Sequence, residues 1–594
     1  MKNIVAIILT AIFTYLFWYI TMPTFAVGFG SKWFLLIFSL IIGGVMFFDG
    51  IPDSISELTK GSKFCFTGAL VVLAGLIIIP IFTTWSAFHA SSYQALLGTV
   101  ENRTITSDMS PINPENVIVI DQQTAHRLAD KKISDEDRAL GSQVELGEIT
   151  LQKVGDKMYY VIPLLHSGFF KYWSNGTQGT PGYVMVNAIN DKDVKLVKNV
   201  NGKPIHIVYQ PGAYFSKQLE RHVYMNGYMT QGFTDPCFEI DDSGRPYYVY
   251  SLYDKTVGMS GSNTVGSLIV DVETGEIKKY GVDDAPAWVD RTQPEQIVAN
   301  QINDWGYYVN GWLNPSDKDR LSMSSDLVLV YGDDGRCYFY AGLTSVGKNG
   351  SSVGFMLIDS RNKKVAYYKQ GGATEEGAMT SAQGKWQEKG YNATHPRPYN
   401  IDGVWTYVMA LKDNEGLVKA VAMVSVAQYE IVGVGETIKD ALRDYKSALN
   451  GSGNSLVAGH KQAETVFDAT IARISMDLKQ GNSYYYFTVD SIKDKMFVIT
   501  SDVSEEITLT KQGDKVHIGF DENGGSTIDV NLFDNLLLKL TKSKEQEKVD
   551  KYFKGVNDTL KAQQNSHDSQ VINTAWDSLS PSEKKKALEN LNKK

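Results

Sequence analysis

Gly244-Arg-Pro-Tyr-Tyr-Val249 is the clearest copy of a short pattern, a glycine followed by strand-forming aromatic residues, that decides how this chain of 594 residues folds. Glycine supplies the positive φ that a tight turn between two strands requires, and aromatic residues favour a pleated, half-buried surface. The pattern returns as Gly155-Asp-Lys-Met-Tyr-Tyr-Val161, as Gly335-Arg-Cys-Tyr-Phe-Tyr340 and, more weakly, as Gly403-Val-Trp-Thr-Tyr-Val408. Each copy predicts a β-hairpin.

A second predicted hairpin follows each copy of the pattern, and a predicted helix precedes it. In the first three copies the second hairpin turns at a residue suited to turns, Asn187, Asp271 or Asp359. The helices are expected to begin near Asp121, Ala213, Pro294 and Glu375. The sequence therefore predicts about four tandem helix-plus-hairpins units, at residues 115–200, 201–285, 286–370 and 371–450, the last with a closing helix. The alternative is that ordinary α+β sequence produces this spacing by chance.

Each predicted unit resembles the small helix-on-sheet fold of PepSY and cystatin-like domains. PepSY domains are extracytoplasmic modules that are often attached to membrane helices, so the resemblance implies such a location for residues 115–432. It rests on the order of helix and strands alone, and no functional residue is carried over from it.

The first 85 residues differ from the rest of the chain, because they hold only seven charged side chains. They contain three uncharged apolar runs, Ile4–Met22, Trp33–Phe48 and Phe66–Trp85. A helix of roughly 20 residues spans the hydrocarbon layer of a bilayer, so residues 1–85 are predicted to form a three-helix membrane anchor, followed by a connector at 86–114. A cleaved signal peptide is the alternative for the first run, which is long for one and lacks an Ala-x-Ala cleavage site.

Basic residues near the ends of the apolar runs predict the orientation of the anchor. Lys2, Lys60 and Lys63 lie on one side and only Lys32 lies on the other. Lysines are enriched on the cytoplasmic side, so the N-terminus is expected in the cytoplasm and residues 86–594 outside the cytoplasmic (inner) membrane, in the periplasm. The runs contain no Asp, Glu, Lys, Arg or His, which favours a passive anchor over a transporter.

Residues 464–540 have short strand-like segments between turn signals, which predict a small barrel of five or six strands. The order resembles an OB barrel, and Ile507–Leu509 is one of its expected strands. Such barrels often bind oligonucleotides or oligosaccharides on an aromatic face, for which Tyr484, Tyr485 and Tyr486 are candidates. Alternate residues of a strand point to opposite faces, so the sequence favours a structural or assembly barrel over a ligand-binding one.

A Lys-rich helical tail is predicted for residues 541–594, beyond the barrel. Four of its apolar residues recur at helical spacing: Val549, Tyr552, Phe553 and Val556. This stripe forms either an interface with a partner or the apolar side of a solvated helix.

Catalytic and cofactor motifs are absent from the sequence, which contains no phosphate-binding loop, His-Glu-x-x-His helix, Gly-x-Ser-x-Gly elbow or Cys-x-x-Cys pair. Gly258-Met-Ser-Gly-Ser262 superficially resembles a nucleophile loop, but no neighbouring His provides a base, and a flexible loop is expected. Cys237 and Cys337 lie on hairpins of adjacent units, where they either pair or remain small buried side chains. No catalytic residue, cofactor or metal site is predicted.

The net charge of −9 makes a sequence-independent nucleic-acid binder unlikely, because phosphate binding needs an excess of Lys and Arg. The sequence predicts an α+β multidomain membrane protein that acts as a non-catalytic extracytoplasmic scaffold. Its partners are the lipid bilayer and either further copies of the chain or another envelope protein. One alternative is a PepSY-like sensor or inhibitor of an envelope enzyme, and another is an enzyme that acts on an envelope polymer with carboxylates in a cleft between units.

Overall fold

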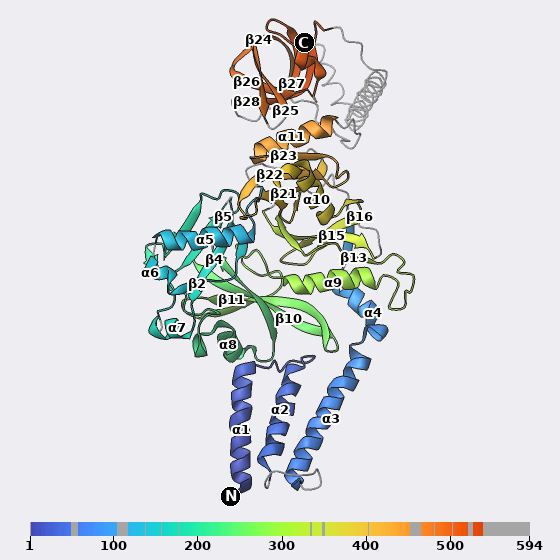
Figure 1. The fold of residues 1–594 in the computed structure, drawn as a ribbon. Helices are drawn as coiled ribbons and strands as arrows, with labels where there is room; N and C mark the ends of the chain where they lie inside the picture. Colours follow the sequence, from blue (N-terminus) through green and yellow to red (C-terminus); the bar gives the residue numbers. More distant parts are fainter. Residues whose placement is uncertain are drawn as a thin grey trace, which may run out of the picture. The chain divides into compact units, whose positions relative to one another are not determined.

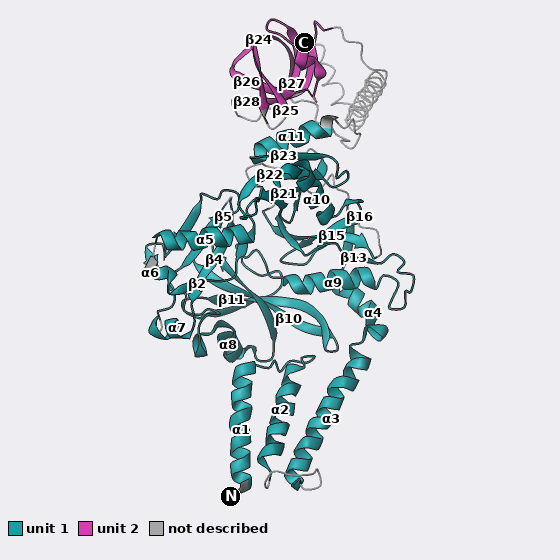
Figure 2. Cartoon of the chain, viewed as in Figure 1, with its two compact units in different colours: residues 1–462 teal, residues 463–594 magenta. Residues whose placement is uncertain are grey.

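The computed structural model describes residues 2–48, 58–103, 117–136, 138–155, 157–175, 178–332, 335–346, 351–401, 403–451, 465–479, 482–501, 503–520 and 527–538. The chain is of the α+β class (Figure 1). It divides into two compact units, residues 1–462 and residues 463–594 (Figure 2).

Three apolar helices begin the first unit: α1 (Lys2–Thr21), α2 (Ser31–Met46) and α3 (Lys60–Thr83). Among the described residues, α1 and α3 are long and apolar enough to cross a membrane, whereas α2 is shorter. Their apolar side chains mostly face outward, which is compatible with a lipid environment. α3 begins at Lys60, six residues earlier than its apolar run, because Thr59 caps it: Thr59 Oγ1 accepts a hydrogen bond from Ser62 N at 3.1 Å.

Four sheets form most of the remaining first unit, antiparallel apart from one edge strand of the third, and each contains one of the recurring glycines between two paired strands. All four glycines have positive φ, between 62° and 86°, as the sequence predicts. The strand pairs around them are β3 (Thr150–Val154) with β4 (Lys157–His166), β9 (Gly232–Ile240) with β10 (Pro246–Val257), β14 (Val328–Tyr331) with β15 (Cys337–Ser345), and β20 (Arg397–Ile401) with β21 (Val404–Lys412).

A second antiparallel hairpin extends each sheet by two strands. These are β5 (Tyr183–Asn187) and β6 (Val194–Val197) in the first sheet, β11 (Ser260–Asp271) and β12 (Ile277–Tyr280) in the second, β16 (Ser351–Asp359) and β17 (Val365–Tyr368) in the third, and β22 (Val418–Ser425) and β23 (Val432–Gly435) in the fourth. Short strands complete the sheets: β2 (Val144–Leu146), β13 (Leu321–Met323), β18 (Gly372–Ala373) and β19 (Asn392–Ala393), with β7 (Asn199–Val200) and β8 (Lys203–Pro204) as a separate pair.

The described residues of the connector form α4 (Ser86–Gln94), a 3-10 turn (Ala95–Leu97) and β1 (Val100–Arg103). β1 pairs in parallel with β17, and the register runs from Val100 opposite Val365 to Arg103 opposite Tyr368, so paired residues are 265 positions apart in the chain. The connector therefore adds an edge strand to the third sheet, which the sequence analysis does not predict.

Helices cover three of the four sheets. α5 (Gln122–Glu136), α9 (Glu295–Tyr307) and α10 (Glu375–Lys385) each begin within one residue of the predicted position. Small and aliphatic residues on their inner faces are fully buried: Ala125, Ala129, Val298, Ile302, Ala378 and Ala382. The predicted closing helix is α11 (Ile438–Gly451), which lies so close to β23 that a Cβ on Gly433 would be 2.3 Å from Tyr445 N.

The helix predicted to begin near Ala213 is not formed. The structure has a 3-10 turn (Phe215–Lys217), the five-residue α8 (Leu219–Val223) and an irregular turn (Tyr224–Tyr228) instead. Gly227 has a φ of 111°, which a helix does not accommodate. Leu219 and Val223 of this segment pack into the core of the second sheet, whereas Arg221 and Tyr224 contact the end of α1 and the residues after it. The segment therefore serves two surfaces, and its helix is short and begins at Leu219 rather than near Ala213.

Short helical elements complete the first unit: α6 (Arg138–Gly141), α7 (Phe169–Asn175) and a 3-10 turn (Gln387–Lys389). Neighbouring sheets share cores. Tyr159 of the first sheet and Phe238 of the second belong to one buried cluster, and Tyr340 of the third sheet and Tyr407 of the fourth belong to another. The hydroxyl oxygens of Tyr340 and Tyr407 lie 2.9 Å apart in a hydrogen bond inside the second cluster.

The second unit contains a closed barrel with the strand order β24-β25-β26-β28-β27. Its strands are β24 (Thr465–Lys479), β25 (Asn482–Val489), β26 (Ile492–Thr500), β27 (Lys515–Phe520) and β28 (Thr527–Asn535), and only β26 and β28 pair in parallel. The strand expected at Ile507–Leu509 is instead part of a 3-10 helix (Glu505–Leu509). Ile507 is fully buried in the barrel core, so its apolar character reflects packing of that turn rather than a strand.

A buried ion pair joins the start of α5 to the end of β21. Lys412 Nζ lies 2.6 Å from Asp121 Oδ2, and the Lys412 side chain is 7% exposed. Burial raises the pKa of Asp121, but hydrogen bonds from Lys412 and Thr124 outweigh burial and hold that pKa below its ordinary value. The pair therefore links the first and fourth sheets.

Replacing Lys412 with Met leaves the Asp121 carboxylate without its partner. We expect Lys412→Met to lower the free energy of unfolding by about 3 kcal/mol at neutral pH, measured by thermal unfolding of the purified protein. Because the folded-state pKa of Asp121 is lowered, the wild-type advantage is present above the unfolded-state pKa and is lost as pH falls through the folded-state pKa. Lys419→Met, which removes the more exposed Lys419–Asp413 pair, is the control and should leave the free energy of unfolding nearly unchanged. Equal losses in the two variants would contradict the assignment.

Candidate functional site

The irregular segment of the second sheet receives the end of α1. Tyr224 is 1% exposed, and its Oη donates a hydrogen bond to the carbonyl oxygen of Pro23 at 2.7 Å. The same Oη accepts a hydrogen bond from Trp18 Nε1 at 3.1 Å. A single buried hydroxyl therefore binds both the last turns of the first apolar helix and the chain that leaves it.

Arg221, one turn earlier, makes a second contact with α1. Its guanidinium lies over the ring of Tyr19, 4.4 Å from the ring centre, and its Nη2 donates to the Tyr19 carbonyl oxygen at 3.5 Å. Further along, Phe25 N donates to the carbonyl oxygen of Met229 at 2.8 Å. The connection between α1 and α2 is thus bonded to the body by its backbone.

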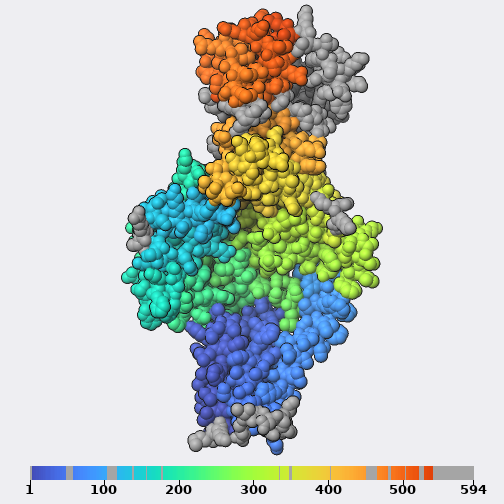
Figure 3. Space-filling model, viewed as in Figure 1, coloured from blue at the N-terminus to red at the C-terminus, as the bar shows by residue number. Residues whose placement is uncertain are grey.

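The hairpin between β10 and β11 meets the end of α3. Met259 N donates to Thr84 Oγ1 at 2.9 Å. Gly258 has a φ of 58°, and a Cβ there would lie 2.3 Å from the carbonyl oxygen of Thr83. The expected flexible loop at Gly258–Ser262 is therefore wrong: it is a tight turn seated on the anchor. We call the contacts of Trp18, Tyr19, Pro23, Phe25 and Thr84 with residues 221–229 and with the β10–β11 hairpin the anchor junction. Figure 3 shows the N-terminal part of the chain (blue) adjoining the green part of the first unit.

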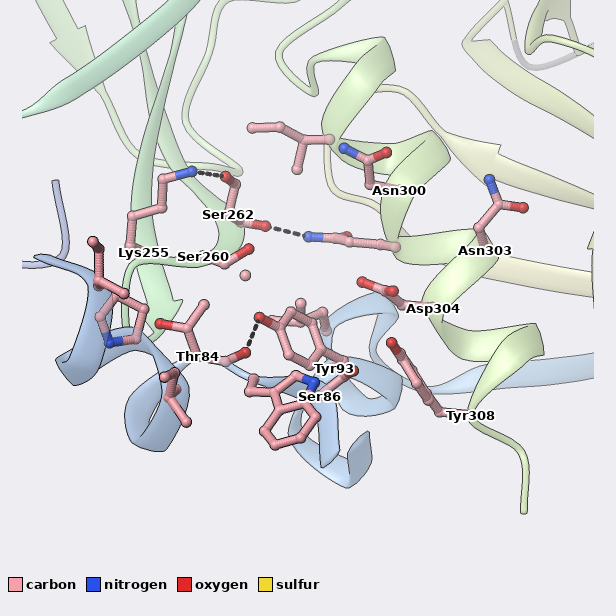
Figure 4. A pocket seen from close by; sticks show the side chains of 18 residues that line it. Thr84, Ser86, Tyr93, Lys255, Ser260, Ser262, Asn300, Asn303, Asp304 and Tyr308 are labelled. Atoms are coloured by element: carbon pink, nitrogen blue, oxygen red, sulfur yellow. Dashed lines mark hydrogen bonds between the residues drawn. The ribbon is translucent and has the colours of Figure 1, made fainter. Parts of the chain in front are cut away.

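A pocket of about 900 Å³ lies beside the anchor junction (Figure 4). Its walls come from the end of α3, from α4, from the β10–β11 hairpin and from α9. The α3 wall is apolar, with Ile77, Pro80 and Ile81, whereas the other walls carry hydroxyl, amide and charged groups. The polar lining residues are Thr84, Ser86, Tyr93, Lys255, Ser260, Ser262, Asn300, Gln301, Asn303, Asp304 and Tyr308.

Hydrogen bonds fix parts of this lining. Tyr93 Oη donates to the Thr84 carbonyl oxygen at 2.7 Å, and Gln301 Nε2 donates to the Ser262 carbonyl oxygen at 2.7 Å. Lys255 Nζ donates to Ser262 Oγ, also at 2.7 Å. Figure 4 shows Lys255 and Asp304 on different walls of the pocket. Among the described residues neither group has an ion-pair partner.

Burial shifts both charged groups toward their neutral forms. It lowers the pKa of Lys255 and raises the pKa of Asp304 to about 6. Lys255 Nζ also lies 5.3 Å from the ring centre of Tyr253. The pocket thus presents one cation and one anion, each partly desolvated and available to a ligand.

A second polar cluster, the central hub, joins the first three sheets. Glu239 is fully buried, and its Oε2 accepts a hydrogen bond from Asp290 N at 2.9 Å. Asp290 Oδ2 accepts from Tyr331 Oη and from Lys153 N, both at 2.9 Å. Burial raises the pKa of both carboxyls. Two carboxylates converge here, but the closed surroundings of Glu239 make the hub a structural junction rather than a substrate cleft.

Cys237 and Cys337 border the hub as free, buried thiols. Arg291 Nη2 donates to Cys237 Sγ at 2.6 Å, and Cys337 faces Tyr331 and Ser360. Of the two alternatives for these cysteines, the structure has the small buried side chains and no disulfide. Within the described parts of the chain, no group of three or more His, Cys, Asp and Glu residues is arranged to hold a metal ion.

The tyrosines proposed for the barrel face lie together on β25 but do not share one surface. Tyr485 packs against the barrel core, whereas Tyr484 is 6% exposed and Tyr486 is half-buried. Ligand binding by these tyrosines stays a prediction. The tail stripe at Val549, Tyr552, Phe553 and Val556 lies outside the described residues.

Sequence reasoning misses the anchor junction and the pocket. No sequence motif surrounds the residues that form them, such as Tyr224, Arg221 and Lys255. Tyr224 and Arg221 contact residues about 200 positions earlier in the chain. The signal that was available is the length of the second sheet's central hairpin: β10 and β11 have 12 residues each, and their tip reaches α3.

Comparisons with known proteins identify no family for this chain. No family model and no curated protein matches it. Among solved structures, Bacillus subtilis arabinanase Arb43A is 12% identical over 58% of this chain and 90% of its own, with a TM-score of 0.16. A Bacteroides thetaiotaomicron endo-1,4-beta-xylanase is 10% identical over 65% and 94%, with a TM-score of 0.15, and a B. megaterium levansucrase mutant is 10% identical over 71% and 97%, with a TM-score of 0.18. Such low TM-scores support no statement about fold or activity.

Removing the Tyr224 hydroxyl tests the anchor junction. Tyr224→Phe leaves the Pro23 carbonyl and the Trp18 indole N–H without their buried partner, which costs about 1–3 kcal/mol. We expect a lower unfolding temperature and faster proteolysis between residues 22 and 31 in detergent. The control is Tyr228→Phe, since within the described residues the Tyr228 hydroxyl makes no hydrogen bond. Wild-type behaviour of Tyr224→Phe in both assays would contradict the role of this hydroxyl.

Proposed function

We propose that this protein is a non-catalytic scaffold anchored in the cytoplasmic membrane, with its sheets and barrel outside the cytoplasm. The observation that carries the proposal is the anchor junction. A flexible tether needs no buried contacts with the domain that it holds, whereas here the apolar helices are bonded to the second sheet through Tyr224, Arg221 and Met259. Such a joint fixes the orientation of the body relative to the bilayer.

The membrane topology belongs to the same proposal. We infer that α2 crosses the bilayer together with α1 and α3, which gives an odd number of crossings. Support comes from the apolar length of α1 and α3. It comes also from the lysines: Lys2 begins α1 and Lys60 begins α3, and lysines are enriched on the cytoplasmic side of membrane helices. Lys32 carries the single positive charge at the other end, where its Nζ donates to the Ala26 carbonyl oxygen at 2.6 Å.

Exposed aromatic side chains support the membrane location as well. Phe170 is 83% exposed, Trp173 is 69% exposed and Phe215 is 50% exposed. Arg221 ties this patch to the anchor, because its Nη1 donates to the Phe215 carbonyl oxygen while its Nη2 reaches Tyr19 at the end of α1. Aromatic residues favour the boundary between lipid and water, so we place the patch there.

We interpret the four sheets as four related copies and the second unit as an OB-type barrel. The repeated order of glycine turn and second hairpin supports the first interpretation. The five-stranded closed order with one parallel pair supports the second. Several copies in one chain offer several separate surfaces, which suits a protein that holds other copies or envelope proteins together.

A sensor or inhibitor of an envelope enzyme is the second candidate function. The pocket favours it, because a ligand bound between α3, α9 and the β10–β11 hairpin touches both the anchor and the body.

The molecular mass of the detergent-extracted full chain tests the scaffold proposal. Light scattering with the detergent contribution subtracted should give either a multimer or a complex with a stoichiometric partner from the same membrane. The same measurement on a chain ending at Gln462 tells whether the first unit alone carries the assembly. A strictly monomeric full chain without a partner, in detergent and after cross-linking in native membranes, would contradict the proposal.

A further inference from the structure

The pocket beside the anchor junction combines two kinds of surface that few soluble ligands match. Ile77 and Ile81 belong to α3 and are 61% and 42% exposed, so their side chains continue the outward apolar surface of that helix into the pocket. The facing walls are rich in hydroxyls and amides from the β10–β11 hairpin and α9. A volume of about 900 Å³ accommodates a ligand of substantial size. An amphiphile, with one apolar and one polar part, fits this division.

The charged side chains inside the pocket restrict the chemistry of the polar group that the ligand carries. Lys255 and Asp304 come from β10 and α9, and within the described residues neither forms an ion pair with the other or with any third group. Holding separated, partly desolvated charges without counter-charges is unfavourable. A ligand that carries both a negative and a positive group supplies a counter-charge to Lys255 and to Asp304, whereas an anionic lipid supplies one to Lys255 only.

The surroundings of Asp304 favour a primary ammonium over a quaternary one. Asn300 and Asn303 lie on the same helix and line the same wall. Asn300 Oδ1 accepts a hydrogen bond from Gln296 Nε2 at 3.2 Å, and Asn303 Oδ1 accepts one from Met323 N at 3.1 Å. A carbonyl oxygen has two lone pairs, so each amide oxygen can accept one further hydrogen bond from a ligand. A primary ammonium donates three hydrogen bonds, and a quaternary ammonium donates none. On the opposite wall, Lys255, Ser260 and Ser262 supply donors suited to a phosphate.

We propose that this pocket binds a phosphoethanolamine lipid, with its phosphate at Lys255, its ammonium at Asp304 and an acyl chain along Ile77 and Ile81. The inference rests on the proposed membrane location of α3. The bound lipid bridges the end of the anchor helix and the body, and so adds to the rigidity of the anchor junction.

Native mass spectrometry of the purified full chain tests the proposal with two defined lipids of identical acyl chains, phosphatidylethanolamine and phosphatidylglycerol. We expect the wild type to bind phosphatidylethanolamine about tenfold more tightly. Asp304→Asn should abolish the preference between the two lipids, because only the ammonium contact is lost. Lys255→Met should weaken the binding of both lipids, because both carry the phosphate. The matched control is Lys278→Met on the exposed strand β12, which should bind like the wild type.

Equal affinity of the wild type for the two lipids would overturn the proposal without any variant being needed. Wild-type lipid binding in both Lys255→Met and Asp304→Asn would also overturn it. Thermal unfolding of each variant separates loss of the site from loss of the fold. The two proposals fail separately: a strictly monomeric chain without a partner that still prefers phosphatidylethanolamine would overturn the scaffold and leave the lipid site, whereas a multimer without that preference would do the reverse.

Discussion

The rest of the structure depends on how the chain satisfies its polar groups where it leaves the apolar helices. Helix ends have backbone groups without partners inside the helix, and a layer of lipid offers none. In this protein the segment that precedes the second sheet supplies partners for the chain just beyond α1: the Tyr224 hydroxyl for the Pro23 carbonyl, and the Met229 carbonyl for the Phe25 amide. These bonds join the body to the connection between α1 and α2.

This arrangement explains why the second sheet departs from the other three. The first, third and fourth sheets bury the apolar faces of α5, α9 and α10, which begin where the sequence predicts. The segment before the second sheet buries Leu219 and Val223 against that sheet, but its helix ends after Val223, and Arg221 and Tyr224 contact the end of α1 and the residues after it. The longer β10–β11 hairpin serves the same purpose at α3. The local structure beside one sheet thus fixes how the four sheets of the first unit are joined to its apolar helices.

Much of the fold follows from local signals in the sequence. The turn glycines, the aromatic strands and the helix starts at Asp121, Pro294 and Glu375 depend on neighbours within a few residues, and the structure has them where they are expected. Ile507 shows the limit, because a buried apolar residue in a short turn gives the same pattern as a strand. Lys255 and Asp304 show the same limit of local signals for the pocket. They come from segments about 50 residues apart, and the pocket that they share is closed by α3, which lies far earlier in the chain.

The central claim is that the anchor and the body form one rigid joint, and hydrogen–deuterium exchange of the full chain in lipid nanodiscs tests it most directly. The informative amides are those of Phe25 and Met259, each bonded across the junction at 2.8 and 2.9 Å. We predict that both exchange as slowly as amides in the paired strands β10 and β11. Exchange of these two amides at the rate of an unstructured loop would contradict the claim and leave the helices as a flexible tether.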